Sequence, residues 1–111
     1  MFEMKCVSQE DTLVILCSGN LDLESFEKFD NFFSENYSKV YQKVVINLQS
    51  LHYLSSVGLR SLLRSAKAVY ADKNKVFVKA KEGMVKNIIL LSGFHKILPL
   101  LEDEVHAVSY S

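Results

Sequence analysis

The sequence lacks an excess of charge of either sign. Its 111 residues include 13 lysines and arginines and 13 aspartates and glutamates, so the formal net charge at pH 7 is zero. Sequence-independent binding of DNA or RNA needs a basic surface that can pair with phosphates. We therefore expect no nucleic acid among the partners of this protein.

Long apolar runs are also absent. The longest, such as Ile88-Ile89-Leu90-Leu91, have four or five residues, whereas a membrane-spanning helix needs about 20. The first residues include Glu3 and lack the extended apolar stretch of a secretory signal. The sequence thus predicts a cytoplasmic protein with no membrane insertion.

Only two cysteines are present, and neither has a second cysteine two or three residues away. Zinc sites and thioredoxin-type sites need that spacing, so Cys6 and Cys17 are predicted to be small core residues in a reducing compartment. His52, His95 and His106 have no ligand spacing either. We expect no metal and no other cofactor.

The length and composition predict one domain that spans residues 1–111. Nearly half of the residues are apolar and 23% are charged, which is typical of a globular protein with a hydrophobic core of its own. The chain contains no internal repeat, low-complexity tract or linker-like stretch.

Strand and helix patterns alternate along the chain. Apolar periodicity predicts strands over residues 4–8, 12–17, 43–48, 75–80 and 97–98, and helices over 23–37, 56–71, 82–91 and 102–109. The strand over 12–17 is apolar on both faces, which indicates a central strand covered above and below. Because the alternation follows an initial hairpin, the predicted fold class is α/β, with a mixed, mostly parallel sheet of four to five strands and helices packed against it.

Two adjacent serines, Ser55 and Ser56, stand where the third strand gives way to a helix. The first amides of a helix lack internal partners and the dipole is positive there, so a phosphoserine would gain hydrogen-bond donors and a favourable field. On local evidence alone capping is the simpler interpretation, since serine is a preferred N-cap. Both interpretations place the pair at the helix start.

Sites in sheets of this kind form beyond the carboxyl ends of the strands. Three loops fulfil that condition: one with Asn20 and Asp22, one with Ser55 and Ser56, and one with Lys81 and Glu82. Asp22 is also placed to cap the helix over 23–37.

The chain resembles, over essentially its full length, a STAS domain of the anti-sigma-factor antagonist (anti-anti-sigma factor) type. The resemblance rests on Ser18-Gly19-Asn20-Leu21-Asp22, on the strand Val44 to Leu48, and on the segment Leu51 to Arg60, which contains the family pattern Ser-Ser-x-Gly-Leu-Arg. Aligned through Gly58, the phosphorylated serine of the family falls on Ser56, with Ser55 as second choice. Asp22 matches the aspartate that closes the loop beside the phosphoacceptor.

Three positions depart from the family pattern. Ser55 and Asn47 stand where many members have aspartate, and Asn20 replaces a frequent glutamate. Together these departures remove negative charge near Ser56.

The resemblance implies a partner switch without catalysis. The unphosphorylated domain would bind a kinase-type anti-sigma factor, the kinase would then phosphorylate the serine, and a serine phosphatase of the PP2C type would reset it. The residues expected to bind the partner are Asn20, Asp22, Ser55, Ser56, Val57, Gly58, Arg60 and Arg64. A homodimer stays open, with Phe32 as an exposed contact.

Three alternatives remain beside this interpretation. Arg60, Arg64 and Lys67 lie at i, i+4 and i+7, which suits either a partner-binding face or a solvated one. A Ser-His-Asp hydrolase built from Ser56, His52 and Asp22 is disfavoured because no Gly-x-Ser-x-Gly motif is present. The same fold could also serve as a fixed subunit of a transport or scaffold assembly, for example beside a lipid-transport ATPase.

Overall fold

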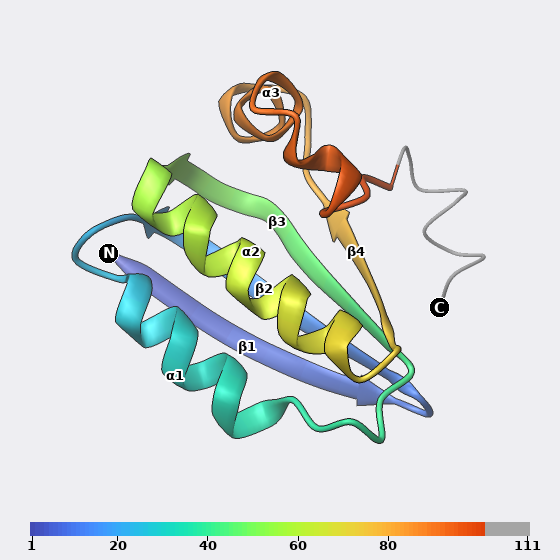
Figure 1. Ribbon diagram of the computed structural model, residues 1–111. Helices are drawn as coiled ribbons and strands as arrows, with labels where there is room; N and C mark the ends of the chain where they lie inside the picture. Colours follow the sequence, from blue (N-terminus) through green and yellow to red (C-terminus); the bar gives the residue numbers. More distant parts are fainter. Residues whose placement is uncertain (102–111) are drawn as a thin grey trace.

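The computed structural model describes residues 1–101 (Figure 1). Its elements are β1 (Phe2–Gln9), β2 (Thr12–Leu21), α1 (Phe26–Asn36), β3 (Lys43–Leu54), α2 (Ser56–Ala71), β4 (Lys75–Lys79), α3 (Met84–Leu91) and the short 3-10 helix η1 (Phe94–Lys96). The predicted helix over 102–109 lies outside the described residues. None of the helices within residues 1–101 is long and apolar enough to pass through a bilayer.

The four strands form one sheet in the order β1-β2-β3-β4. β1 is antiparallel to β2, whereas β2, β3 and β4 run parallel to one another. A single bridge between Val78 and Leu100 extends the sheet beside β4. The predicted α/β fold with a mixed, mostly parallel sheet is confirmed.

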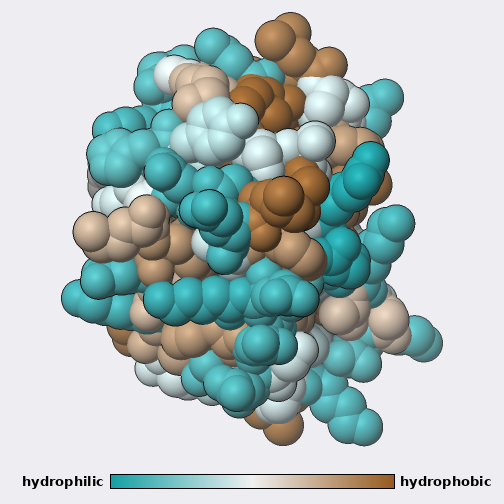
Figure 2. Space-filling view, turned by 90° about the vertical axis from the view of Figure 1, so that its left-hand side faces the viewer, coloured by the Kyte–Doolittle hydropathy of each residue, from teal (hydrophilic) through white to brown (hydrophobic). Residues whose placement is uncertain are grey.

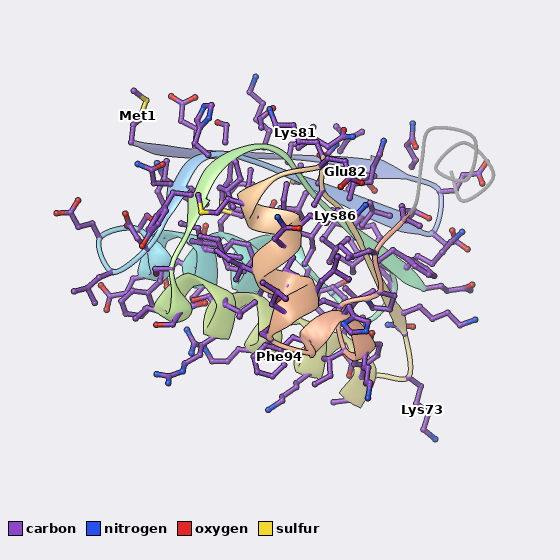
Figure 3. All side chains as sticks on the ribbon, turned by 90° about the horizontal axis from the view of Figure 1, so that it is seen from above. Met1, Lys73, Lys81, Glu82, Lys86 and Phe94 are labelled. Atoms are coloured by element: carbon purple, nitrogen blue, oxygen red, sulfur yellow. The ribbon has the colours of Figure 1, made fainter. Side chains whose placement is uncertain are left out.

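The helices α1, α2 and α3 lie on one side of the sheet (Figures 1 and 3). On that side of β2, Leu13, Ile15 and Cys17 are buried, whereas on the opposite side Val14 is half-buried and Leu16 is 37% exposed. β2 is a central strand, as predicted, and within residues 1–101 the helices cover one of its two faces. Apolar residues on both faces indicated two cover layers, and the described helices supply only one.

Apolar stripes of the two long helices fill the space beneath the sheet. In α1, Phe29 and Phe33 are buried and stacked at a centroid distance of 6.5 Å. The buried residues of α2 include Leu59, Leu62, Leu63, Ala66 and Val69. Phe32 is half-buried and packs against this core, so the prediction that it is an exposed contact is wrong.

The two cysteines differ in burial. Cys17 is 2% exposed, and its burial raises the pKa of the thiol to about 12. Cys6 is half-buried, packs against the core, and donates its thiol hydrogen to Asn36 Oδ1 at 3.3 Å. Both thiols are free, and the core position predicted for Cys17 is confirmed.

Several predicted boundaries are wrong by a few residues. β3 continues to Leu54, α1 begins at Phe26 after a turn, and α3 begins at Met84. These differences lie in polar or mixed segments, where periodicity gives no clear end.

The predicted edge strand at 97–98 is wrong. The backbone N–H of Leu98 donates to Phe94 O at 2.8 Å, which commits it to the turn of η1. Pairing occurs around Pro99 instead: Val78 N donates to Pro99 O, and Leu101 N donates to Val78 O, each at 2.8 Å.

One close backbone contact joins β2 to α2. Gly58 is buried in the first turn of α2, and a Cβ added there would lie 2.3 Å from Leu21 O and 2.9 Å from Leu21 C. Ser55 N donates to the same Leu21 carbonyl oxygen at 3.0 Å. Gly58 therefore serves packing inside the domain.

We predict that Gly58→Ala lowers the free energy of unfolding. The added methyl group meets backbone atoms that cannot move aside, and overpacking of this kind costs roughly 1–3 kcal/mol even though alanine favours the helix by about 1 kcal/mol. Urea unfolding of both proteins measures the difference. Arg60→Ala, at an exposed position of α2, is the control and should change stability by less than about 0.5 kcal/mol. A Gly58→Ala variant as stable as the parent would contradict the contact.

Candidate functional site

The carboxyl ends of β2 and β3 lie side by side. Asn20 pairs with Tyr53 and Leu21 pairs with Leu54, and α2 starts directly after Ser55. The loop that follows β2 and the start of α2 therefore meet at one edge of the sheet, on the left of Figure 1. The structure thus brings together two of the three predicted loops.

Ser55 is the N-cap of α2. Its backbone is extended, with φ −88° and ψ 172°, and its Oγ accepts a hydrogen bond from Gly58 N at 3.1 Å. The side chain is half-buried. The capping interpretation is therefore confirmed for Ser55, whose oxygen satisfies one of the amides that the helix leaves without a partner.

Ser56 occupies a different environment one residue later. It is the first residue of α2 and is exposed, and its hydroxyl forms no hydrogen bond with any residue of 1–101. The first turn of α2 contains no acidic residue. An exposed hydroxyl at the positive end of a helix can accept a phosphate without loss of an existing contact.

The loop after β2 is fixed by its own hydrogen bonds. Asp22 Oδ1 accepts hydrogen bonds from Glu24 N at 3.0 Å and from Ser25 Oγ at 3.1 Å. Ser25 Oγ also lies 2.7 Å from the carbonyl oxygen of Asn20. It accepts a hydrogen bond from Asp22 N at 3.0 Å. Asp22 therefore closes a turn, and the prediction that it caps a helix starting at residue 23 is wrong.

Ser25 is a residue that sequence reasoning missed. It is 8% exposed and stands at the N-cap position of α1, where its side chain bonds to the turn rather than to the helix amides. The signal was available as an aspartate followed three residues later by a serine, a spacing that side-chain turns use.

The basic residues of α2 also differ from one another. Arg60 and Lys67 are exposed, which suits both the partner-binding face and the solvated face that the sequence left open. Arg64 donates to Asp30 Oδ2 on α1 and to Ser61 Oγ, each at 2.8 Å. Because the Arg64 and Asp30 side chains are 52% and 33% exposed, this ion pair adds at most about 1 kcal/mol of stability. Arg60 is the exposed cation nearer to Ser56 along α2.

Exposed apolar side chains near this edge were not predicted. Leu23 is 72% exposed in the loop after β2, and Tyr53 is 45% exposed at the end of β3. Val57 in the first turn of α2 is half-buried. Figure 2 views the side of the molecule that bears this edge and shows brown apolar patches among teal polar ones. A leucine placed directly after Asp22 in a polar turn was the available signal.

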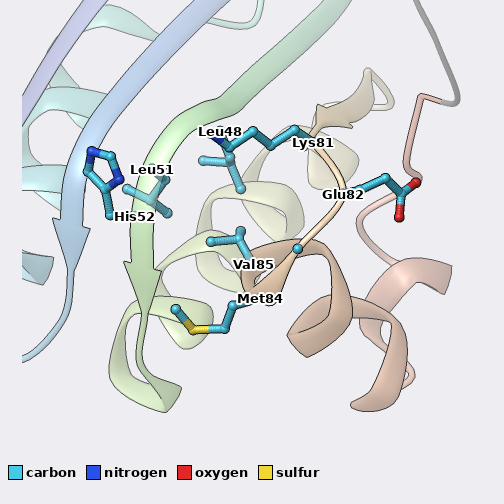
Figure 4. A pocket seen from close by; sticks show the side chains of 8 residues that line it. Leu48, Leu51, His52, Lys81, Glu82, Met84 and Val85 are labelled. Carbon is cyan, nitrogen blue, oxygen red and sulfur yellow. The ribbon is translucent and has the colours of Figure 1, made fainter.

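The third predicted loop lies beside β3, at the start of α3. Lys81 and Glu82 line a small pocket of about 110 Å³ together with residues of β3 and α3 (Figure 4). Glu82 forms an ion pair with Lys86 at 2.6 Å. Pockets that hold small molecules usually have several hundred Å³, so this one does not point to a small ligand.

Three further points concern a hydrolase site, a metal site and the position of Asn47. Asp22 directs its carboxylate to Glu24 and Ser25 instead of His52, so the Ser-His-Asp arrangement is not formed. Within residues 1–101, no three Cys, His, Asp or Glu side chains gather closely enough to hold a metal ion. Asn47 lies in the middle of β3 rather than at its end.

Comparison with known proteins agrees with this architecture. The model of the STAS domain family matches residues 3–107. A protein of Bordetella bronchiseptica that carries the name anti-sigma factor antagonist BtrV is 26% identical over 100 residues, which cover 89% of this chain and 86% of that protein.

Two solved structures share the fold at low sequence identity. The crystal structure of an anti-sigma factor antagonist from Mycobacterium paratuberculosis has a TM-score of 0.87 and 20% identity, and the match covers 99% of this chain and 93% of that one. The Bacillus cell fate determinant SpoIIAA in its phosphorylated form has a TM-score of 0.72 and 16% identity, with 100% of both chains covered. Because the family model spans nearly the whole sequence and the fold is shared, this chain belongs to the STAS domain family.

Proposed function

We propose that this protein is an anti-sigma-factor antagonist that binds a kinase-type anti-sigma factor and is released when Ser56 is phosphorylated. The observation that carries the proposal is the exposed Ser56 hydroxyl at the start of α2, beside the loop that follows β2. The relatives named as anti-sigma factor antagonists support it. The protein itself catalyses nothing in this scheme, and a PP2C-type phosphatase removes the phosphate.

The choice of Ser56 over Ser55 follows from their hydrogen bonds. Ser55 Oγ is already engaged with Gly58 N, and a phosphate on that oxygen would have to displace the cap. Ser56 Oγ has no such bond among residues 1–101. A kinase that phosphorylates Ser56 therefore meets an accessible hydroxyl on a helix that stays capped.

The switch works through charge rather than through a change of fold. Phosphate adds about 1.5 to 2 negative charges at pH 7. At the amino end of α2 these charges are favoured by the helix dipole, so the free domain tolerates them. At an interface they must be desolvated, which costs several kcal/mol unless the partner supplies a cation. Binding would then weaken while the domain remains folded.

The surface around Ser56 has the composition of a docking site. Leu23 and Tyr53 offer exposed apolar contact area on either side of the β2–β3 edge, and Arg60 adds a cation one turn along α2. Aromatic and arginine side chains dominate the binding energy of many protein interfaces. A partner that covers these residues would also cover Ser56.

Phosphorylation by the cognate anti-sigma kinase is the direct test. With ATP and the kinase, we expect one added phosphate in the intact mass, located on Ser56 by fragmentation, and at least a tenfold loss of affinity for the kinase. Such a loss corresponds to about 1.4 kcal/mol. Ser56→Ala should bind without release, and Ser56→Asp should bind more weakly than the parent.

The matched control is Ser55→Ala, which keeps Ser56 and should still accept one phosphate. Phosphate on a residue other than Ser56 would refute the assignment of the acceptor. No phosphate at all with an active kinase would instead favour the fixed subunit of a transport or scaffold assembly.

The two serines should also differ in their effect on stability. Ser55→Ala removes the side-chain acceptor of Gly58 N, so we expect a loss of about 1 kcal/mol in the free energy of unfolding. Ser56→Ala removes no hydrogen bond within residues 1–101 and should change stability by less than about 0.5 kcal/mol. Urea unfolding curves measure both. The reverse order would show that Ser56 is the cap.

A further inference from the structure

Helix α3 is apolar around most of its circumference but is covered on one side. Six of its eight residues are Met, Val, Ile or Leu, and only Val85 and Ile89 are buried in the core. The helix packs against β3 and η1, and it lies in front of the other helices when the molecule is seen from above (Figure 3). Because a helix that is apolar all round is normally enclosed all round, the exposed side of α3 is a candidate contact surface.

Four residues form the exposed side. With about 100° of rotation per residue, Met84, Asn87, Leu90 and Leu91 lie within a sector of about 120° that points away from Val85 and Ile89. Met84 is 44% exposed, Leu90 is 41% exposed and Leu91 is 88% exposed. Asn87 is exposed as well. We call these four residues the α3 face. Exposed apolar groups that gather in this way mark sites of interaction.

The α3 face contains no charged residue. Glu82 and Lys86 stand beside it, and their side chains pair with each other at 2.6 Å. Lys81 and Lys96 lie beyond the two ends of the helix. A second molecule can therefore approach the α3 face without bringing like charges together at its centre.

We propose that the α3 face binds the α3 face of a second copy of this chain, with the two helices antiparallel about a two-fold axis at Asn87. In this arrangement Met84 of each copy lies opposite Leu90 of the other, and Leu91 of each copy extends over the amino end of the other helix. A two-fold contact of this kind uses the same patch of both molecules. Each apolar pair is therefore made twice.

Asn87 explains why a second copy suits the face better than a purely apolar partner. An amide side chain both donates and accepts hydrogen bonds, so two Asn87 side chains on a two-fold axis can bond to each other. An apolar helix or a lipid surface would leave the Asn87 amide without a hydrogen bond in the contact, which is unfavourable. A single polar residue between packed helices also fixes their register.

The helix dipoles favour the same arrangement. In an antiparallel pair, the positive amino end of each α3 lies near the negative carboxyl end of the other. Lys81, just before the amino end, then comes near the carboxyl end of the second helix, where a cation is favoured. Eight residues make a helix of about 12 Å. A contact of this length buries little area, so we expect a weak and reversible dimer.

Sedimentation equilibrium of the full chain tests the dimer. The range from about 10 μM to about 1 mM covers the association expected of a small interface. We expect a monomer–dimer equilibrium, and Leu91→Asp should raise its Kd at least tenfold because a charge replaces an apolar contact. The matched control is Val40→Asp, which places the same charge at a 75% exposed apolar position between α1 and β3 and should change the Kd less than twofold.

Two results would overturn the proposal. One is a parent protein that stays monomeric at the highest concentration, and the other is a Leu91→Asp variant that dimerises as tightly as Val40→Asp. Both substituted positions are exposed, so both variants should fold, and urea unfolding checks this.

Cross-linking tests the position of the two-fold axis. In a Cys6→Ser background, Asn87→Cys is treated with a short bis-maleimide, while Cys17 is shielded by its burial. Because the two introduced thiols would be neighbours at the axis, we expect a covalent dimer in the intact mass. Ser34→Cys, at an exposed position of α1, is the control and should give at least a fivefold lower yield.

Equal yields from the two variants, including no dimer from either, would contradict the placement of the axis at Asn87. Both experiments use the free protein and need no kinase. They therefore succeed or fail independently of the proposed switch at Ser56.

Discussion

The contact between Leu21 and the first turn of α2 determines the geometry of the candidate site. One carbonyl oxygen, Leu21 O, accepts a hydrogen bond from Ser55 N and leaves no room for a Cβ at Gly58. The end of β2 and the start of α2 are therefore held together by backbone atoms rather than by flexible side chains. This contact fixes where α2 begins, and with it the positions of Ser55 and Ser56 at the edge.

The same contact explains why adjacent serines have different chemistry. Ser55 is directed into the turn, where it caps α2, and the helical rotation then directs Ser56 outward. The loop after β2 is also fixed by hydrogen bonds, since Ser25 Oγ accepts from Asp22 N and donates to Asp22 Oδ1. A phosphate on Ser56 would add negative charge at this edge without displacing the Ser55 cap, as the proposed binding switch requires.

Much of the fold was predictable because periodicity follows burial. Apolar periodicity predicted a strand over 43–48 and a helix over 23–37, and Val44, Ile46, Leu48, Phe29 and Phe33 of these segments are buried. The Ser25 turn was not predictable, because a hydrogen-bonded turn leaves no apolar period. The length of β3 was missed for a related reason: Gln49 and Ser50 interrupt the apolar run, although pairing with β2 continues to Leu54.

The two faces of β2 differ in the cover that residues 1–101 provide. A strand that is apolar on both faces predicts cover on both faces, and the described helices provide it on one side only. The physical premise still holds, since Val14, Val45 and Phe77 are poorly suited to water. The face of the sheet that carries Val14, Val45 and Phe77 and the edge that carries Ser56 are therefore different surfaces of the described chain.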